Sequence, residues 1–253
     1  METHRYGPAP AQAGDLYLPK AKHPPVVCLL HGGFWRLPYA RDQMVSLALD
    51  LVGRSYAVWN LEYRRIGEAG GGWPGTLTDV AAGIDYLAEL KAKGVDLDLT
   101  RAVTVGHSAG GHLALWAAGP RRLTPDSPKP TVRVMAAVGQ APAADLKRIY
   151  ELGSSNHVAL ELTGGTPAQF PERYRAASPR ALLPLGVPQL VVHGSADDTV
   201  LVDMGRDYVE AALAAGDDAE FVEVKAAGHF EHLNPNGSAW AAVTVWLERM
   251  FET

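Results

Sequence analysis

The sequence predicts an α/β domain in which helices cover both faces of a mostly parallel, doubly wound sheet. Short runs rich in valine, leucine and alanine, which are typical of buried parallel strands, alternate with segments of helical spacing. Turn residues separate these segments, and no internal repeat or long low-complexity run breaks the alternation. The 253 residues, 47% hydrophobic and 20% charged, suffice for a single domain over residues 1–253 with a large core.

Each expected strand is a short apolar run followed by turn residues. After one or two edge strands within residues 6–18, the expected strands are residues 26–30, 56–61, 102–105, 132–138, 190–194 and 220–224. Each expected helix has apolar residues at helical spacing, with a cap or a glycine at an end. The expected helices are residues 41–53, 76–93 and 111–118, and a capping box of Thr76 and Asp79 begins the second.

A serine stands between the strand at residues 102–105 and the helix at residues 111–118. Residues 106–110 read GHSAG and match the pattern G-x-S-x-G. Small residues beside Ser108 let the backbone turn tightly, so the hydroxyl projects from the sheet near a helix N-terminus, where free N–H groups favour an anion. Ser108 is therefore the expected nucleophile. The alternative is a glycine-rich turn that only begins a helix.

A glycine pair follows the strand at residues 26–30. Residues 31–35 read HGGFW, which resembles the HGG-type loop that forms part of the oxyanion hole in lipases and esterases. Acyl transfer puts negative charge on the substrate carbonyl oxygen, and each backbone N–H aimed at that oxygen contributes about 2.7–4 kcal/mol. The expected donors are the N–H groups of Gly33, Phe34 and Ala109. The alternative is a simple β-turn after a buried strand.

An acid and a base follow two later strands. Asp197 comes after the first of these strands and His229 after the second. The order Ser108, Asp197, His229 is that of the α/β-hydrolase triad, and parallel strands end at one edge of a sheet, where the three side chains can converge. We expect Asp197 rather than Asp198 to orient the histidine, and His229 rather than His232 to act as the base.

These motifs resemble those of α/β-hydrolases in the esterase branch shared by hormone-sensitive-lipase-like carboxylesterases and kynurenine formamidases. The resemblance covers residues 26–246 and rests on the segments HGGFW, GHSAGG, HGSAD and GHF. It implies an α/β-hydrolase fold with Ser108 as nucleophile, Asp197 as acid and His229 as base. Phe34 replaces the third glycine of the HGGG form, which fits formamidase-like and short-chain variants better than large lipases.

The implied activity is that of a serine hydrolase, a carboxylesterase that cleaves small carboxylic esters through an acyl-enzyme intermediate. An arylformamidase or amidase would use the same triad. A peptidase and a non-catalytic binding module on the same fold are the less favoured alternatives. The reaction needs no cofactor, and the expected partner is a small-molecule ester or amide substrate.

Residues 141–179 form a long segment without a clean strand, with helical stretches expected at residues 145–152 and 171–177. A segment of this length in a compact domain is usually functional, so we expect a small cap over the active site rather than a solvated insertion. Because the segment is not strongly apolar, acyl chains beyond about the hexanoyl length should find no further apolar wall. Trp35 and Trp73 are expected to line the substrate pocket.

Composition narrows the class of protein. The formal net charge of -5 does not indicate a nucleic-acid partner. The N-terminal segment has no apolar signal-peptide core and no run of about 18 apolar residues occurs, so we expect a cytoplasmic protein that does not bind a membrane. No histidine pair has a third ligand at metal-binding spacing, so no metal is expected. Cys28 is expected to pack in the core, and a homodimer is left open.

Overall fold

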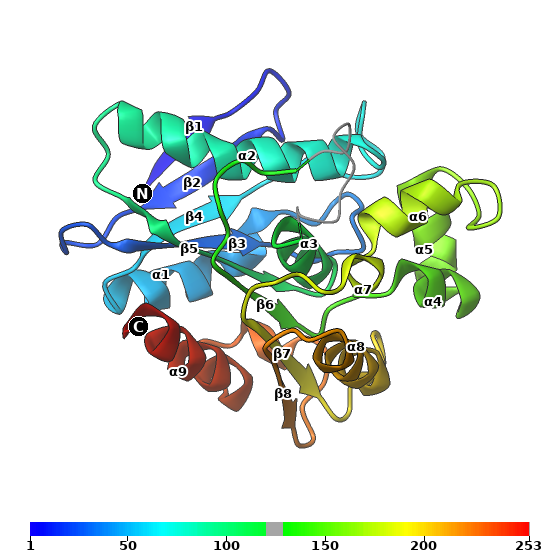
Figure 1. Ribbon diagram of the computed structural model, residues 1–253. Helices are drawn as coiled ribbons and strands as arrows, with labels where there is room; N and C mark the ends of the chain where they lie inside the picture. The colour runs from blue at the N-terminus through cyan, green and yellow to red at the C-terminus, as the bar shows by residue number, and fades with distance from the viewer. Residues whose placement is uncertain (120–128, 253) are drawn as a thin grey trace.

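The computed structural model describes residues 1–119 and 129–252, and an eight-stranded sheet runs through its centre (Figure 1). The strands are β1 (Glu2–Arg5), β2 (Ala13–Tyr17), β3 (Pro25–Leu30), β4 (Ala57–Leu61), β5 (Asp98–His107), β6 (Ala136–Gln140), β7 (Gln189–Gly194) and β8 (Ala219–Val224). Their order across the sheet is β1-β2-β4-β3-β5-β6-β7-β8. β2 is antiparallel to β1 and β4, and the other neighbouring pairs are parallel. The strands from β3 to β8 therefore end at one edge, as predicted.

Helices lie on both faces of this sheet. They are η1 (Arg41–Met44), α1 (Val45–Gly53), α2 (Gly75–Ala92), α3 (Ala109–Ala117), α4 (Leu146–Glu151), α5 (Ser154–Thr163), α6 (Pro171–Ala177), α7 (Pro179–Leu182), α8 (Val202–Ala214), η3 (Glu231–Leu233) and α9 (Ser238–Glu252). α1 and α9 cover one face, α2, α3 and α8 cover the other, and α4, α5 and α6 form a lobe at one side (Figure 1). None of the described helices is long and apolar enough to span a membrane.

The alternation of side chains along the strands divides the core into two layers. On β3, Val26, Cys28 and Leu30 pack in the layer under α2 and α3, whereas Val27 and Leu29 pack in the layer under α1 and α9. Cys28 is 1% exposed, and burial raises the pKa of its thiol to about 12. Full burial of one such aliphatic side chain contributes about 1.5–3 kcal/mol, so these two layers are the main source of stability.

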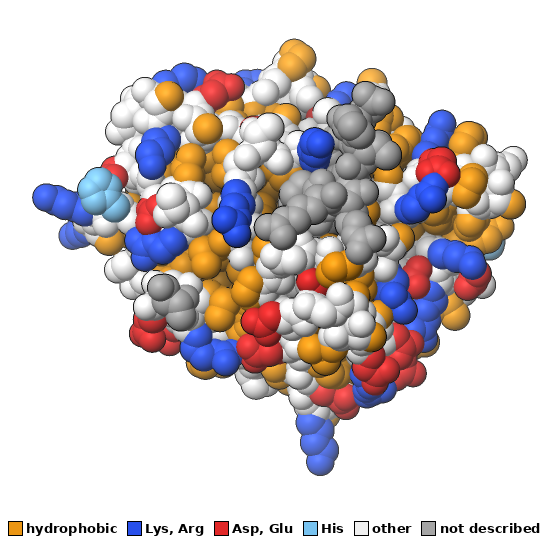
Figure 2. Space-filling model, in the orientation of Figure 1, with side chains coloured by type: hydrophobic (Ala, Val, Ile, Leu, Met, Phe, Trp, Pro, Cys, Tyr) orange, Lys and Arg blue, Asp and Glu red, His pale blue; other side chains and the backbone are white. Residues whose placement is uncertain are grey.

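Charged side chains of both signs mix on the surface. Arg206 of α8 forms ion pairs with Asp203 of α8 and Glu223 of β8. Acidic and basic side chains gather together at the lower right of the view in Figure 2. Exposed pairs of this kind contribute about 0–1 kcal/mol each. The surface charges therefore do not decide the fold.

One sequence prediction about these elements needs a correction to its bounds, and another is wrong. The strand predicted at residues 132–138 is instead β6, which begins at Ala136, because the side chain of Asp85 on α2 binds the amides of Thr131 and Val132. Thr76 does not begin a capping box. Its hydroxyl accepts from the amide of Gly72 and donates to the carbonyl of Arg64, and Thr76 is the second residue of a helix whose N-cap is Pro74.

Four short helices occupy the segment predicted as a cap, residues 141–179, and its immediate continuation. The helices predicted at residues 145–152 and 171–177 are confirmed as α4 and α6, whereas α5 and α7 were not predicted. α5 is irregular, because Ser155, Asn156 and His157 have positive φ angles of 49°, 54° and 58°. No pattern of apolar residues marks such a kinked turn, so the sequence does not predict α5.

Candidate active site

Ser108 occupies the turn between β5 and α3, at the edge where the parallel strands end. Its φ of 57° and ψ of -118° lie outside the regions common for residues with a side chain. The amide of Ser108 donates to the carbonyl oxygen of Gln140 on β6 at 2.8 Å, which fixes the turn against the neighbouring strand. The predicted strand–serine–helix arrangement is therefore present, and the serine stands in front of the N-terminus of α3.

Glycines allow the backbone at this turn to pack unusually closely. A Cβ on Gly106 would lie 2.1 Å from the carbonyl oxygen of Gly110, and a Cβ on Gly110 would lie 2.0 Å from the carbonyl oxygen of Leu30. Both distances are far inside van der Waals contact, so β3, β5 and the first turn of α3 can meet only where these side chains are missing. The glycines around Ser108 thus place it beside the loop that follows β3.

Asp197 and His229 meet between the loops that follow β7 and β8. His229 Nδ1 lies 2.7 Å from Asp197 Oδ2, and both side chains are buried. Asp197 Oδ1 accepts hydrogen bonds from the amides of Thr199 and Val200, each at 2.9 Å. Burial acts to raise the pKa of Asp197, but hydrogen bonds from His193 and His229 outweigh it and lower that pKa below its ordinary value. A charged carboxylate is therefore aimed at His229.

His107 joins the loop of His229 to the turn of Ser108. Its Nε2 donates to the carbonyl oxygen of His229 at 2.8 Å, and the two ring centroids are 4.7 Å apart. Among the described residues no hydrogen bond links Ser108 Oγ to His229 Nε2. Contacts of this kind often form only in the substrate complex. Nothing in the sequence marks His107, because its anchor is a main-chain carbonyl 122 residues away.

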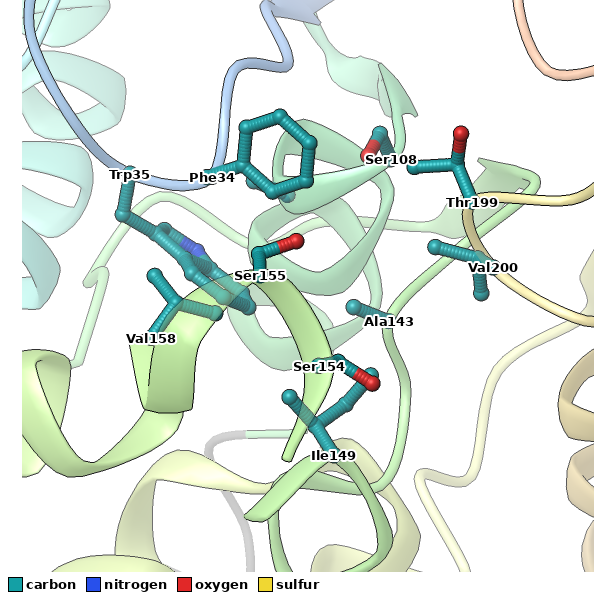
Figure 3. A pocket seen from close by; sticks show the side chains of 11 residues that line it. Phe34, Trp35, Ser108, Ala143, Ile149, Ser154, Ser155, Val158, Thr199 and Val200 are labelled. Atoms are coloured by element: carbon teal, nitrogen blue, oxygen red, sulfur yellow. The ribbon is translucent and has the colours of Figure 1, made fainter. Parts of the chain in front are cut away.

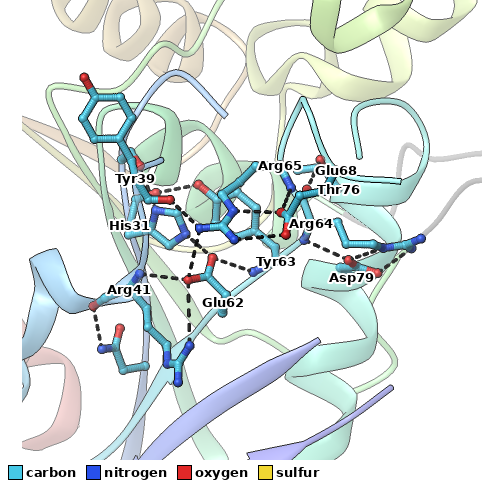
Figure 4. A network of polar contacts seen from close by, with 12 residues as sticks. His31, Tyr39, Arg41, Glu62, Tyr63, Arg64, Arg65, Glu68, Thr76 and Asp79 are labelled. Carbon is cyan, nitrogen blue, oxygen red and sulfur yellow. Dashed lines mark hydrogen bonds and ion pairs between the residues drawn. The ribbon is translucent and has the colours of Figure 1, made fainter. Parts of the chain in front are cut away.

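A buried polar network holds the loop that follows β3 (Figure 4). His31 Nε2 lies 2.7 Å from Glu62 Oε1, and the hydroxyl of Tyr63 donates to the carbonyl of His31 at 2.8 Å. Arg65 donates to the carbonyl of Tyr39 at 2.6 Å, at the far end of the loop. Burial acts to raise the pKa of Glu62, but its hydrogen bond with His31 and the nearby charges, including Arg65, keep that pKa below its ordinary value. The network is therefore an ionic brace for the loop.

The loop held by this brace carries two of the three predicted oxyanion donors. Gly33, Phe34 and Trp35 all have positive φ angles, of 105°, 57° and 54°. A Cβ on Gly33 would lie 2.2 Å from the Cβ of Tyr39, so this position also requires glycine. Within the described part of the chain, the amides of Gly33, Phe34 and Ala109 donate no hydrogen bond, so they can bind a ligand oxygen.

A narrow cavity, here called the inner slot, opens at Ser108. It encloses about 280 Å³, open solvent included, and Figure 3 shows the side chains around it. The lining residues are Phe34, Trp35, Ser108, Ala109, Ala143, Ile149, Ser154, Ser155, Val158, Thr199 and Val200. A wider outer groove of about 940 Å³, open solvent included, shares six of these residues and adds Leu152, Asp198, Leu201 and Met204. The serine therefore faces a small apolar space that continues into a larger open one.

The two tryptophans predicted to line the pocket have different positions. Trp35 lines the inner slot, and its indole N–H donates to His112 Nδ1 at 3.3 Å. The side chain of Trp73 packs on the core and is not among the residues that line the inner slot, so its predicted role in substrate binding stays a prediction. The amide of Trp73 donates to the carbonyl of Leu162 at 2.7 Å, so the backbone of Trp73 holds the end of α5.

The described residues include no group of three histidine, cysteine, aspartate or glutamate side chains arranged to hold a metal ion. His112 is a packing residue whose Nε2 donates to the carbonyl of Ala177 at 2.8 Å. His232 is fully buried beside His107, and neither of its ring nitrogens has a hydrogen-bond partner among the described residues. These histidines therefore belong to the scaffold around the site.

Comparison with known proteins identifies one matching family and several similar proteins. The BD-FAE family model matches residues 14–211. The isoprenylcysteine alpha-carbonyl methylesterase ICME of Arabidopsis thaliana is 28% identical over 235 residues, covering 86% of this chain and 53% of that protein. The esterase LipC of Mycobacterium tuberculosis is 27% identical over 237 residues, covering 88% of this chain and 58% of that protein. The chain thus spans only a little over half the length of these relatives.

Solved structures share the whole fold. A truncated carbohydrate esterase from gut microbiota superposes with a TM-score of 0.86 at 20% identity, covering 100% of this chain and 97% of that one. Esterase 2 of Thermogutta terrifontis with bound propionate has a TM-score of 0.77 at 23% identity, covering 99% of this chain and 92% of that one. These likenesses confirm the predicted α/β-hydrolase fold.

The geometry predicts that Asp197, and not its neighbour, supports the histidine. Asp197→Asn should lower kcat on the order of 10²–10⁴-fold, because an amide cannot stabilise the imidazolium in the same way. Asp198 is exposed and accepts a bond from the Thr199 hydroxyl, so Asp198→Asn should leave kcat near the wild-type value. Steady-state hydrolysis of p-nitrophenyl butyrate measures both variants. Equal losses in the two would contradict the assignment.

The buried histidines predict acid sensitivity of the fold. Burial lowers the pKa of His112 to about 4 and that of His232 to about 3. An unfolded chain binds these protons near pH 6.5, so the free energy of unfolding should fall as pH drops from about 6.5 to 4, by about 1.4 kcal/mol per pH unit for each histidine.

Urea unfolding between pH 4.5 and 7.5 measures this slope. His112→Gln can still accept from Trp35 and donate to Ala177, and it should flatten the slope by about one proton. A slope that is the same in both proteins would show that His112 titrates normally in the folded state.

Proposed function

The chain belongs to the BD-FAE family, and from this premise we propose that it is a serine esterase that cleaves small carboxylic esters through an acyl-enzyme intermediate. The observation that carries the proposal is the hydrogen bond of 2.7 Å between His229 and Asp197, beside a serine held at a strand-to-helix turn. A protein that only binds a ligand has no need of a buried carboxylate aimed at a histidine at this place. The esterases among its relatives support the same reaction class.

The proposed reaction has two steps, acylation of Ser108 and hydrolysis of the acyl-enzyme, and His229 transfers a proton in both. Ser108 Oγ attacks the ester carbonyl carbon while His229 Nε2 takes the serine proton. Asp197 keeps the Nδ1 proton on His229 and stabilises the imidazolium. The amides of Gly33, Phe34 and Ala109 hold the oxyanion, and collapse of the intermediate expels the alcohol, which receives the proton from His229. Water then attacks the acyl-serine by the same route in reverse and releases the acid.

The two connected spaces support a division between acyl and alcohol groups. We assign the acyl group to the inner slot, where Trp35, Ile149 and Val158 offer apolar contact near Ser108. The alcohol then lies in the outer groove, where Asp198 adds a polar group. Esterase 2 of Thermogutta terrifontis has been solved with propionate and with butyrate bound, which agrees with short acyl groups in this fold.

The segment at residues 141–179 serves as the cap in this proposal. Ile149 of α4 and Ser154, Ser155 and Val158 of α5 all line the inner slot. Arg36 directly follows the loop that carries Gly33 and Phe34. It donates to the carbonyl of Ser155 at 2.8 Å and pairs with Glu161 at 2.8 Å. One guanidinium thus ties the cap to the oxyanion side of the site.

The first test addresses the nucleophile. Ser108→Ala should fold with a Tm close to that of the wild type. Its kcat should be at least about a thousandfold lower, because no other group can form the acyl-enzyme. Paraoxon should label the wild type at Ser108 and leave Ser108→Ala unlabelled, as esterase 2 of Thermogutta terrifontis has been solved phosphorylated by this compound. Labelling at another residue, or a variant that keeps a tenth of its kcat, would reject the assignment.

The second test addresses the substrate. For p-nitrophenyl acetate, butyrate, octanoate and palmitate, kcat/KM should be highest at acetate or butyrate, because each further methylene gains about 0.8 kcal/mol only while apolar wall remains. Ile149→Ala should move the maximum to longer chains by enlarging the slot. A wild-type maximum at octanoate would contradict the assignment of the slot. An aryl formamide hydrolysed faster than every ester would identify an arylformamidase instead.

A further inference from the structure

His193, at the end of β7, contacts the carboxylate that the mechanism uses. His193 Nε2 lies 3.3 Å from Asp197 Oδ2 and 2.7 Å from the carbonyl oxygen of Val200. Its side chain and that of Asp197 are both 0% exposed. The same carboxylate oxygen that receives His229 therefore also faces a second imidazole that water cannot reach.

These contacts fix the tautomer of His193. A carbonyl oxygen only accepts hydrogen bonds, so Nε2 must carry the proton that it donates to Val200. That N–H lies between Val200 and Asp197 Oδ2, whereas the amide of Val200 donates to Asp197 Oδ1 at 2.9 Å. His193 thus closes the turn that holds both oxygens of the carboxylate.

The opposite edge of the His193 ring is set by a missing side chain. Gly205 lies within α8, and a Cβ there would lie 2.5 Å from His193 Nδ1 and 3.0 Å from Val191 Cγ1. Nδ1 has no hydrogen-bond partner among the described residues. The ring is therefore located by packing against bare helix backbone on one side and by its hydrogen bonds on the other.

We propose that His193 is a positioning residue that fixes the carboxylate of Asp197 and thereby the imidazole of His229, and that Gly205 sets the place of the His193 ring. The inference rests on the proposed serine-esterase function. A carboxylate held by the amides of Thr199 and Val200 alone could rotate about its last bond. The Nε2–H that His193 donates to the Val200 carbonyl also lies beside the oxygen that binds His229, with 3.3 Å between Nε2 and Oδ2, so its partial positive charge limits that rotation where it matters for proton transfer.

The test uses variants matched in length. His193→Gln keeps an N–H donor about as far from the backbone as Nε2, and His193→Met keeps the length without the donor. Gly205→Ala places a methyl group against the ring from the side of α8. Its control is Gly53→Ala at the end of α1, where a Cβ would meet nothing within 4 Å. Alanine is normally favoured over glycine in a helix, so a loss of activity in Gly205→Ala alone cannot come from helix propensity.

The kinetic measurement is kcat and KM for p-nitrophenyl butyrate, per active site titrated with paraoxon. His193→Met and Gly205→Ala should lose on the order of 10- to 100-fold in kcat with little change in KM, because the reacting groups are displaced while the binding slot is intact. His193→Gln should recover most of kcat, and Gly53→Ala should match the wild type. Equal kcat in the glutamine and methionine variants, or losses that vanish once active sites are titrated, would overturn the proposal.

A proton NMR measurement separates this inference from the proposed function. The low-field resonance of the His229 Nδ1 proton should be present in the wild type and His193→Gln, and shifted upfield in His193→Met and Gly205→Ala. Asp197→Asn identifies the signal. If Gly205→Ala keeps an unshifted resonance, His193 does not position His229. If the wild type neither hydrolyses esters nor reacts with paraoxon, the esterase proposal fails, and the resonance still decides the positioning role.

Discussion

The site depends on backbone segments that approach closer than side chains would permit. At the serine turn, the first turn of α3 lies against the end of β3, where a Cβ on Gly110 would reach within 2.0 Å of the carbonyl of Leu30. The loop after β7 meets the loop after β8 in the same way, with 2.2 Å from a Cβ on Gly194 to the carbonyl of Ala227. Ser108, Asp197 and His229 come from three different loops, and these contacts set the distances between the loops.

A second constraint is the burial of charge around these contacts. Glu62 and Asp197 are both buried, and a carboxylate in such a place is tolerated only when hydrogen bonds replace its water. Glu62 holds the loop of Gly33 and Phe34 through His31, and Asp197 holds His229. Each buried acid thus fixes one side of the site. Replacing either by an apolar residue could keep the core filled but would release the loop that the acid holds.

The fold and the places of the candidate site residues after the strands could be predicted from the sequence to a large extent, because both depend on local patterns. Ser108, Asp197 and His229 each follow a strand-like run, and the structure places each of them there. The position of Trp73 and the role of Asp79 could not be predicted, because they are decided by partners far along the chain. Asp79 pairs with Arg64 across the loop at the end of β4 rather than capping its own helix.

The inner contacts of the site were hidden for a related reason. His193 reads as the first residue of a glycine turn, and its contact with Asp197 depends on the folded shape of the turn between them. The kinked α5 has three successive residues of positive φ that no residue preference favours. Arg36 binds main-chain carbonyls there, and such contacts leave no trace in the identity of Ser155 or Asn156.

Because Cys28 is buried, the rate at which its thiol is alkylated can be used to measure opening of the fold. Cys28 is the only cysteine in the sequence. It lies on β3 with its side chain in the core layer under α2 and α3, and β4 and β5 flank its strand. A thiol-reactive dye cannot reach it through a breathing loop, since β3 is exposed only when the centre of the sheet separates. The rate of alkylation therefore measures how often the core around β3 opens, without denaturant and without modifying Ser108.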